Sequence, residues 1–381
     1  MNIAHVISSM HPDQGGPPAV ALRIAAAQRH QGHSVSLISY DLNESDEKVV
    51  SKVTAEFDDL GFGTDHWVRL KGTNGKEGNR LLSIIKTLDF VHIHGVWGTL
   101  PLRVASMAYK QGVPYTITPH GMLDPWCMRQ KALKKKIGLI LGYRKMLNRA
   151  NFLHVLNFDE GELMKPLGLS ARRITIPNGV FLNEIDPLPD KGLFREAYPQ
   201  IGKNPFVLFL SRLHYKKGLD YLADAFSLAA EAHPDAWLVV AGPDGGALKA
   251  FEEQIQSLGI ADRVLLTGPI YGEAKYHALV DANCFCLPSR QEGFSIAITE
   301  ALACGRPVVI TENCHFPEVA EVGAGHVCPL SGATVGQALI EVLGDPGRAE
   351  AMGTAGRALI EERFTWPKIA ERCLKAYRGE I

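Results

Sequence analysis

Apolar and polar positions follow a regular order along the chain, in which short apolar runs are separated by longer amphipathic stretches. In the first half, apolar runs of strand length fall at residues 3–7, 35–39, 90–94, 115–118, 152–155 and 174–176. The segments between them, such as 18–31, have the length and periodicity of helices. Strands separated by helices are typical of a parallel sheet with crossover connections. The first half therefore predicts an α/β unit.

The second half repeats this pattern, with apolar runs at residues 206–210, 236–241, 264–266, 284–287 and 308–310. Prolines such as Pro187 interrupt the periodicity between the halves, which is typical of a linker. We therefore expect two Rossmann-like domains facing each other across a cleft, at residues 1–183 and 205–365, with a linker at 184–204. A last helix within 366–381 is expected to join the first domain.

The composition is that of a globular protein rather than a disordered, fibrous or membrane-spanning one. The chain has 381 residues, of which 46% are hydrophobic and 21% charged, and this length suits two domains. A formal net charge of −1 argues against nucleic acid as a partner. The seven cysteines predict reduced core thiols. The N-terminus has the pattern of a strand rather than a signal peptide, and no apolar run has the length of a membrane span, so we expect a cytoplasmic protein.

The stretch from Glu292 to Glu300 is the most informative part of the sequence. It follows a buried strand that ends at Pro288, and it places one acid in a glycine turn and a second acid inside the helix that follows. A helix N-terminus offers free N–H groups and a partial positive charge, which suit a phosphate. Carboxylates can accept hydrogen bonds from sugar hydroxyls. The segment therefore predicts a site for a sugar attached to a nucleoside diphosphate.

Two cations, Arg212 and Lys217, follow the first predicted strand of the second half. An arginine fork and a lysine point charge on one loop can neutralise a diphosphate, although a solvated basic helix start is the alternative. The corresponding loop of the first half carries Gly15 and Gly16, where a missing Cβ allows the backbone to approach a ligand. The loop lacks the G-x-G-x-x-G pattern, which disfavours a dinucleotide site.

Three histidines lie in or just after predicted strands of the first half. His120 lies just after the strand at 115–118, where it could contact a substrate hydroxyl or stabilise a developing charge; a structural loop histidine is the equal alternative. His92 and His94 share one face of their strand. A metal would need a third ligand that the surrounding sequence does not supply, so a structural role is favoured for this pair.

A basic segment at residues 129–149 mixes lysines and arginines with apolar residues and follows Trp126. This pattern predicts either a helix on a membrane surface or a solvated helix with one face toward the core. In the first case, peripheral contact with the inner face of the membrane and a lipid-linked acceptor would follow.

With these motifs assembled, the chain resembles the retaining nucleotide-sugar glycosyltransferases of the GT-B fold, in the group called family 4. Similar exopolysaccharide and lipopolysaccharide enzymes of bacteria share the segment 119–126. The resemblance rests on Gly15-Gly16, His120-Gly121, Ile176-Pro177-Asn178-Gly179, Ser211-Arg212 with Lys217-Gly218, Val240-Ala241-Gly242-Pro243, and Glu292 with Glu300.

The resemblance implies a role for each of these positions. Arg212 and Lys217 would bind the donor diphosphate in place of a metal ion, and Glu300 would bind the ribose. His120 and Glu292 are the implied catalytic residues, with Glu292 contacting the donor sugar. The implied donor-binding residues are Gly15, Gly16, Arg212, Lys217, Gly293, Phe294, Ser295, Ile296 and Glu300.

The implied activity is retaining, metal-independent transfer of a hexose from a nucleotide sugar, with UDP-glucose as the first expectation, to a glycan or lipid-linked glycan of a surface polysaccharide. No cofactor is expected beyond the nucleotide-sugar substrate. A nucleotide-sugar epimerase of the same two-lobed fold, a phosphorylase and a non-catalytic nucleotide-sugar binding protein are the alternatives. A glycosidase would use Glu292 and Glu300 as a carboxylate pair, but Arg212 and Lys217 would then have no function.

Overall fold

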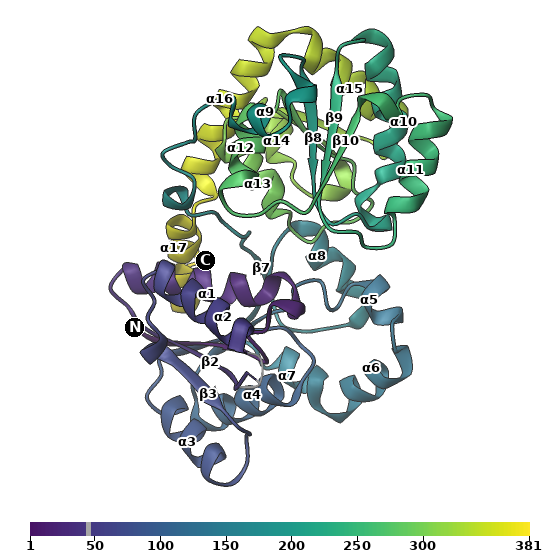
Figure 1. The fold of residues 1–381 in the computed structure, drawn as a ribbon. Helices are drawn as coiled ribbons and strands as arrows, with labels where there is room; N and C mark the ends of the chain where they lie inside the picture. Colours follow the sequence, from purple (N-terminus) through teal and green to yellow (C-terminus); the bar gives the residue numbers. More distant parts are fainter. Residues whose placement is uncertain (43–46) are drawn as a thin grey trace. The chain divides into compact units, whose positions relative to one another are not determined.

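The computed structural model describes residues 1–42 and 47–381. These residues form two compact units (Figure 1). The first comprises Met1–Asn178 and Trp366–Ile381, and the second comprises Gly179–Thr365. Each unit is an α/β domain with its own parallel sheet, as the alternation of apolar runs predicts.

The sheet of the first unit has seven parallel strands in the order β3-β2-β1-β4-β5-β6-β7. This order reverses direction between β1 and β4, which is where open α/β sheets bind ligands. The strands are β1 (Asn2–Ile7), β2 (Ser34–Tyr40), β3 (Trp67–Leu70), β4 (Phe90–His94), β5 (Tyr115–Thr118), β6 (Phe152–Val155) and β7 (Arg173–Thr175). The helices are α1 (Gly16–His30), α2 (Glu47–Asp59), α3 (Gly75–Ile85), α4 (Thr99–Gln111), α5 (Pro125–Arg129), α6 (Ala132–Gly138), α7 (Arg144–Asn148), α8 (Phe158–Leu163) and α17 (Trp366–Arg378).

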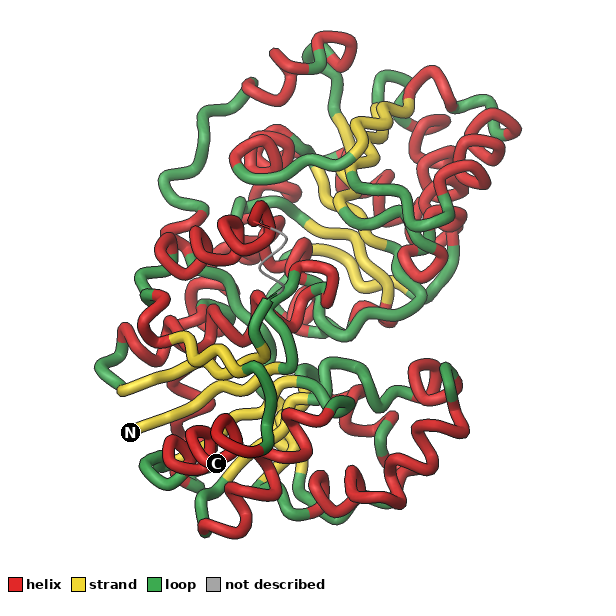
Figure 2. Tube along the Cα trace, turned by 60° about the horizontal axis from the view of Figure 1, so that its bottom comes forward, coloured by secondary structure: helices red, strands yellow, loops and turns green. Residues whose placement is uncertain are grey.

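The second unit has a six-stranded parallel sheet in the order β10-β9-β8-β11-β12-β13, again with a reversal beside its first strand. Figure 2 shows the strands of each sheet side by side, with helices around them. The strands are β8 (Phe206–Leu210), β9 (Trp237–Ala241), β10 (Val264–Gly268), β11 (Cys284–Leu287), β12 (Val308–Thr311) and β13 (Gly325–Cys328). The helices are α9 (Leu193–Ala197), α10 (Leu219–Ala232), α11 (Leu248–Ser257), α12 (Glu273–Asp281), α13 (Ile296–Ala303), α14 (Glu318–Glu321), α15 (Gly332–Gly344) and α16 (Pro346–Arg363).

The last helix, α17, returns to the first unit and lies against α1 (Figure 1). Its buried face includes Trp366, Cys373 and Tyr377. The ring of Tyr377 stacks on Phe90 of β4 with 4.2 Å between the ring centroids. The C-terminal residues are therefore part of the core of the N-terminal unit.

The expected linker at 184–204 is not a free connection. The structure assigns it to the second unit, where it contains α9. Phe194 and Ile201 are buried in the core of that unit, and Asp281 accepts hydrogen bonds from the backbone N–H groups of Gly192 and Phe194 at 2.6 and 2.9 Å. The linker was predicted from proline content alone, which does not show that the apolar residues between the prolines pack into the core of the second unit.

Candidate functional site

Two loops at the carboxyl ends of β8 and β11 lie against each other in the second unit. Gly218 makes this possible: its φ is +70°, and an added Cβ would lie 1.9 Å from the carbonyl oxygen of Pro288. Arg290 joins the loops from the other side, since its backbone N–H donates to the carbonyl of Lys216 at 2.7 Å and its guanidinium pairs with Asp220. Any larger residue at Gly218 would push the loops apart.

Glu292 lies at this junction and is paired with Lys217. The Nζ atom of Lys217 lies 2.6 and 2.9 Å from the two carboxylate oxygens, and Ser289 Oγ donates to Oε1 at 2.6 Å. The Glu292 side chain is only 8% exposed and that of Lys217 23% exposed. The pair carries no net charge, so Lys217 does not present a free positive charge in this structure.

Glu300, one and a half turns into α13, is paired in the same way with a residue that the sequence did not single out. Lys275 Nζ of α12 lies 2.5 Å from Glu300 Oε1. Burial acts to lower the pKa of Lys275, but the charge of Glu300 and the neighbouring Tyr276 outweigh it and raise that pKa. Both acids of the 292–300 segment are thus held in place by lysines.

The N-terminus of α13 is open in the way an anion site requires. Its N-cap, Ser295, makes no side-chain cap bond, and the first turn holds no acid. Among the described residues, no group accepts from the backbone N–H of Phe294, Ser295 or Ile296. An added Cβ at Gly293 would meet nothing within 4 Å. The N–H groups and the partial charge of the helix remain available to a ligand.

Arg212 supplies an uncompensated cation on the loop after β8. Its side chain is exposed, and the described part of the chain provides no carboxylate partner for it. The stem of the side chain packs against Gly245, where an added Cβ would lie 3.0 Å from it. Arg212, rather than Lys217, is therefore the charge that a phosphate would meet unpaired.

In the first unit, the predicted glycines form the start of α1. Gly15 has a φ of +79° and is the N-cap, and Gly16 is the first helical residue. An added Cβ at either position would meet nothing within 4 Å. The helix has no side-chain cap bond and no acid in its first turn. Pro17 and Pro18 follow Gly16 and carry no N–H, so this helix start, beyond the carboxyl end of β1, offers a ligand fewer backbone donors than that of α13.

His120 lies beyond β5 in a turn with left-handed backbone, where its φ is 53° and that of Gly121 is 72°. The carboxylate of buried Glu160 holds this turn by accepting from the N–H groups of Gly121 and Leu156, each at 2.7 Å. Burial lowers the pKa of His120 to about 3. The ring is therefore neutral near pH 7 and stands next to His94, with 3.1 Å between His94 Nδ1 and His120 Nε2.

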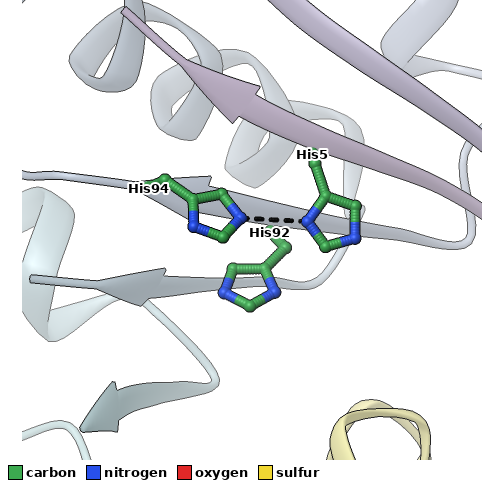
Figure 3. Close-up of side chains that lie close together, drawn as sticks. All are labelled: His5, His92 and His94. Atoms are coloured by element: carbon green, nitrogen blue, oxygen red, sulfur yellow. Dashed lines mark hydrogen bonds between the residues drawn. The ribbon is translucent and has the colours of Figure 1, made fainter. Parts of the chain in front are cut away.

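His94 belongs to a cluster of buried histidines that sequence reasoning described only in part. His5 of β1 contacts His94 at 2.9 Å between Nδ1 and Nε2 (Figure 3). Ring nitrogens of His5, His92 and His94 all lie within 4.8 Å of one another, as metal ligands must. However, the His5–His94 hydrogen bond already joins two of these nitrogens, and the third ring bonds to other groups. The structural interpretation of His92 and His94 fits this arrangement better than a metal site.

The basic segment 129–149 forms α6, a π-helical turn at Leu139–Tyr143 and α7 at the outer edge of the first unit (Figure 1). Leu139, Met146 and Leu147 face the core. Leu133, Ile140 and Leu141 are instead 74%, 82% and 76% exposed. The segment thus has both a core-facing side and an exposed apolar side beside its lysines. Among the described helices, none is both long enough and apolar enough to cross a bilayer.

The predicted residues fall into two groups, one at each sheet. Glu292, Gly293, Phe294, Ser295, Ile296, Glu300, Arg212 and Lys217 lie in the second unit, and Gly15, Gly16 and His120 lie in the first. Sequence reasoning missed Lys275, Ser289 and Glu160. Lys275 and Glu160 contact residues 25 and 39 positions away, which no local pattern records, whereas Ser289 is only three residues from its partner Glu292. His5 of β1, the strand next to the one that carries His94, could have been identified from the sequence, because it is a polar residue in the middle of an apolar run.

Two family models match the chain, one for each unit. The model described as "Glycosyl transferase 4-like domain" matches residues 15–179, and that described as "Glycosyl transferases group 1" matches residues 190–359.

Relatives and solved structures agree with these matches. The chain is 33% identical over 237 residues to a GDP-mannose-dependent phosphatidylinositol monomannoside mannosyltransferase of Mycolicibacterium smegmatis, covering 59% of this chain and 61% of that protein. It is 29% identical to the lipopolysaccharide core biosynthesis mannosyltransferase LpsB of Rhizobium meliloti, covering 56% and 64%. These matches thus span less than two thirds of either relative. The crystal structure of Anabaena HepE with UDP has the same fold, with a TM-score of 0.78, 17% identity and full coverage of both chains.

Proposed function

Because the chain belongs to the glycosyltransferase family whose two domain models match its two units, and has the GT-B fold, we propose that it transfers a hexose from a nucleoside-diphosphate sugar to a glycan or lipid-linked glycan acceptor. One observation carries this proposal: the open N-terminus of α13 is flanked by two carboxylates, Glu292 and Glu300, each fixed by a lysine. Helix N–H groups suit phosphate, and fixed carboxylates suit hydroxyls.

In this proposal, the donor diphosphate binds Arg212 and the N–H groups at residues 294–296. Glu300 accepts hydrogen bonds from the ribose hydroxyls and Glu292 from those of the sugar. Lys217 and Lys275 hold the two acids in their orientation, and Lys217 adds its donors to a bound phosphate. Together these cations and N–H groups would serve in place of a metal ion, because they supply the positive charge that the leaving group needs.

The transfer is proposed to retain the anomeric configuration. The bond between the anomeric carbon and the diphosphate oxygen breaks, and the nucleoside diphosphate leaves with the electron pair. The acceptor oxygen forms its bond on the same face of the sugar, and its proton passes to the departing phosphate. The neutral ring of His120 adds no positive charge beside an anomeric carbon that becomes positive.

UDP-glucose remains the donor expected from the sequence, and GDP-mannose is its main rival, because the Mycolicibacterium relative is named for that donor. A thermal-shift screen across UDP- and GDP-sugars tests this choice, since a ligand that binds only the folded state raises the melting temperature. No shift with any nucleotide sugar would contradict the proposed site.

Turnover separates the rival functions. The transferase should release nucleoside diphosphate only when an acceptor glycan is present, should form the retained anomer by NMR, and should stay active in EDTA. Epimerisation of the sugar nucleotide without acceptor would favour the epimerase. Binding without turnover on any acceptor panel would favour a binding protein, and a strict Mn²⁺ or Mg²⁺ requirement would contradict metal independence.

We further propose that α6 and the turn after it rest on an anionic membrane surface during transfer to a lipid-linked acceptor. Leu133, Ile140 and Leu141 are exposed apolar groups, and lysines neighbour them in the sequence. Apolar insertion together with basic charge is the combination that holds a protein at anionic lipid.

Sedimentation with vesicles tests this surface. Binding is expected to vesicles that contain phosphatidylglycerol and not to phosphatidylcholine alone. Changing Lys134, Lys135 and Lys136 together to Glu should abolish it, whereas the same change at Lys249, an exposed lysine of the second unit, should leave it intact. Equal sedimentation of all variants would leave the solvated-helix interpretation.

A further inference from the structure

Five histidines of the first unit form one continuous chain of hydrogen bonds that ends at His120. It contains Ile176, His154, His92, Tyr377, Gln28, His5, His94 and His120, in this order. These residues come from β1, α1, β4, β6, α17 and the loops after β5 and β7. A neutral imidazole has one nitrogen that donates a hydrogen and one that accepts. The direction of each hydrogen bond therefore fixes the direction of the next one along the chain.

The chain has a fixed starting point at the carbonyl of Ile176. A carbonyl oxygen can only accept, and His154 Nε2 lies 2.7 Å from it, so the hydrogen of His154 is on Nε2. Burial lowers the pKa of His154 to about 4, so the ring is neutral near pH 7 and its Nδ1 carries a lone pair. His92 Nε2 lies 3.3 Å from this Nδ1 and 2.6 Å from Thr118 Oγ1. A hydrogen on His92 Nε2 satisfies both neighbours, whereas a hydrogen donated by Thr118 to Nε2 would leave two lone pairs facing each other.

The next hydrogen bonds of the chain are made by Tyr377 of the C-terminal helix α17. With its hydrogen on Nε2, His92 must accept at Nδ1, and Tyr377 O–H donates to it at 2.6 Å. The Tyr377 oxygen has then used its only hydrogen, so it accepts from the amide N–H of Gln28 at 3.2 Å, and the neighbouring Cys373 thiol can only donate to it. This orients the Gln28 side chain with Oε1 toward His5 Nε2, at 2.9 Å.

The last links lead to the candidate site. Because Gln28 Oε1 accepts, His5 carries its hydrogen on Nε2 and accepts at Nδ1 from His94 Nε2, at 2.9 Å. His94 then accepts at Nδ1 from His120 Nε2, at 3.1 Å. The reverse direction would set the lone pairs of His92 and His154 against each other at 3.3 Å.

We propose that this one-directional chain holds His120 in the tautomer protonated on Nε2, so that its Nδ1 presents a lone pair to bound substrate, and that Tyr377 is a positioning residue for the transfer. The role of Tyr377 in turnover rests on the proposed function; the tautomer does not. Among the described residues, no group hydrogen-bonds to His120 Nδ1. The ring therefore accepts a hydrogen bond from a sugar hydroxyl rather than donating one.

The tautomers can be measured without turnover, by two-bond ¹H–¹⁵N correlation NMR on protein labelled at its histidines and assigned by single His→Gln variants. We expect wild-type His5, His94 and His120 to carry hydrogen on Nε2. Tyr377→Phe removes the hydroxyl and keeps the stacked ring, so Gln28 becomes free to turn over. A second set of signals with hydrogen on Nδ1 should then appear for His94 and His120.

Tyr115→Phe is the matched control. Tyr115 is buried in the same unit, and its hydroxyl donates to the carbonyl of Met146 at 2.7 Å, outside the chain. Both variants should lose similar thermal stability. Only Tyr377→Phe should change the His120 signals and lower kcat, by about two- to tenfold, at unchanged KM for the donor, because part of the population holds the wrong tautomer.

Three results would overturn the proposal: hydrogen on Nδ1 of wild-type His120, unchanged His94 and His120 signals in Tyr377→Phe, or equal effects of the two tyrosine variants. A stoichiometric metal in the purified protein that is lost in His5→Ala would also overturn it, since a metal would replace the His5–His94 bond. If the spectra agree but no sugar transfer occurs, the proposed function fails and the tautomer assignment stands.

Discussion

The strands of the first unit and the loop after β5 carry a chain of neutral imidazole rings, whereas the carboxyl ends of the second unit's strands lead to paired charges. His5, His94 and His120 are buried or half-buried, and burial lowers their pKa values. In the second unit, Glu292 and Glu300 are instead paired with Lys217 and Lys275. Both arrangements avoid an isolated buried charge, one by deprotonation and the other by pairing.

The difference matches what each sheet is proposed to contact. A diphosphate is highly charged and needs the cations and N–H groups of the second unit. A sugar whose anomeric carbon becomes positive is better served by the neutral ring of the first. The same fold, used twice, thus supports two electrostatic environments, and the predictions below test this contrast.

We expect the largest effect from a lower pH, which should destabilise the first unit more than the second. Each histidine of the chain has a folded pKa below its unfolded value of 6.5, with His5 at about 4, His120 at about 3 and His154 at about 4. Between pH 6.5 and 4 the unfolded chain therefore binds more protons, and the stability of the first unit falls as the pH falls. Glu160, whose pKa is raised to about 7, acts in the opposite direction because it gains its proton in this range.

We expect a net loss of stability for the first unit between pH 7 and pH 4.5, because five histidine pKa values are lowered and one carboxyl pKa is raised. In the second unit, burial also lowers the pKa of His326. The buried thiols of that unit, such as Cys286, have raised pKa values, so they stay neutral over this pH range and do not contribute. Hydrogen exchange at pH 7 and pH 4.5, resolved by peptide, measures this. Equal acid sensitivity of the two units would contradict the contrast.

Removal of the unpaired cation should have the next largest effect. Arg212→Ala should weaken the binding of UDP or GDP by roughly 1.5–3 kcal/mol, as expected for a charged hydrogen bond, with little change in melting temperature because the side chain is exposed. Isothermal calorimetry measures the affinity. Lys249→Ala, at an exposed lysine of the same unit, is the control, and unchanged affinity in Arg212→Ala would remove this residue from the site.

The ion pair between Lys217 and Glu292 should contribute less free energy than Arg212 does. A double-mutant cycle should nevertheless detect it as a coupling energy. In a double-mutant cycle with Lys217→Ala and Glu292→Ala, we expect a coupling of about 1–2 kcal/mol in unfolding free energy, since the pair is only partly shielded from water. Urea denaturation of the four proteins gives this value. Additive effects would mean that the two side chains are held independently.

Gly16→Ala should have the smallest effect on stability and still reduce activity. Nothing lies within 4 Å of the added Cβ, so the unfolding free energy should change by less than about 1 kcal/mol. If ligand approaches this backbone, kcat/KM should fall about tenfold. Gly347→Ala, in the first turn of α16, is the matched control. Full activity of Gly16→Ala would assign Gly16 a purely structural role.

Most strands were predictable because buried parallel strands are short, continuous apolar runs. Residues 90–94, 115–118, 152–155, 206–210 and 284–287 were predicted with their observed bounds. The strands β3 and β13, both at sheet edges, were missed. Trp67–Leu70 includes Arg69, and Gly325–Cys328 begins with a glycine, so neither forms an apolar run. Hydrogen bonds to a neighbouring strand, rather than local pattern, make these segments strands.

For the site, the sequence alone determined which residues have the right chemistry: Glu292 and Glu300 around a helix start, cations on the loop after β8, and glycines at the start of α1. Only the tertiary structure decided which charges are free. It pairs Lys217 with Glu292 and leaves Arg212 without a carboxylate partner among the described residues. The partner of Glu300, Lys275, is 25 residues away in the sequence.

The same division holds for His120. Its position after a strand was predictable, but its protonation was not, because Tyr377 and Gln28 are 349 residues apart and meet only when α17 packs on α1. A local pattern records the residue types in one element. The state of a buried imidazole depends on what its two nitrogens touch, and those contacts are made by packing between elements.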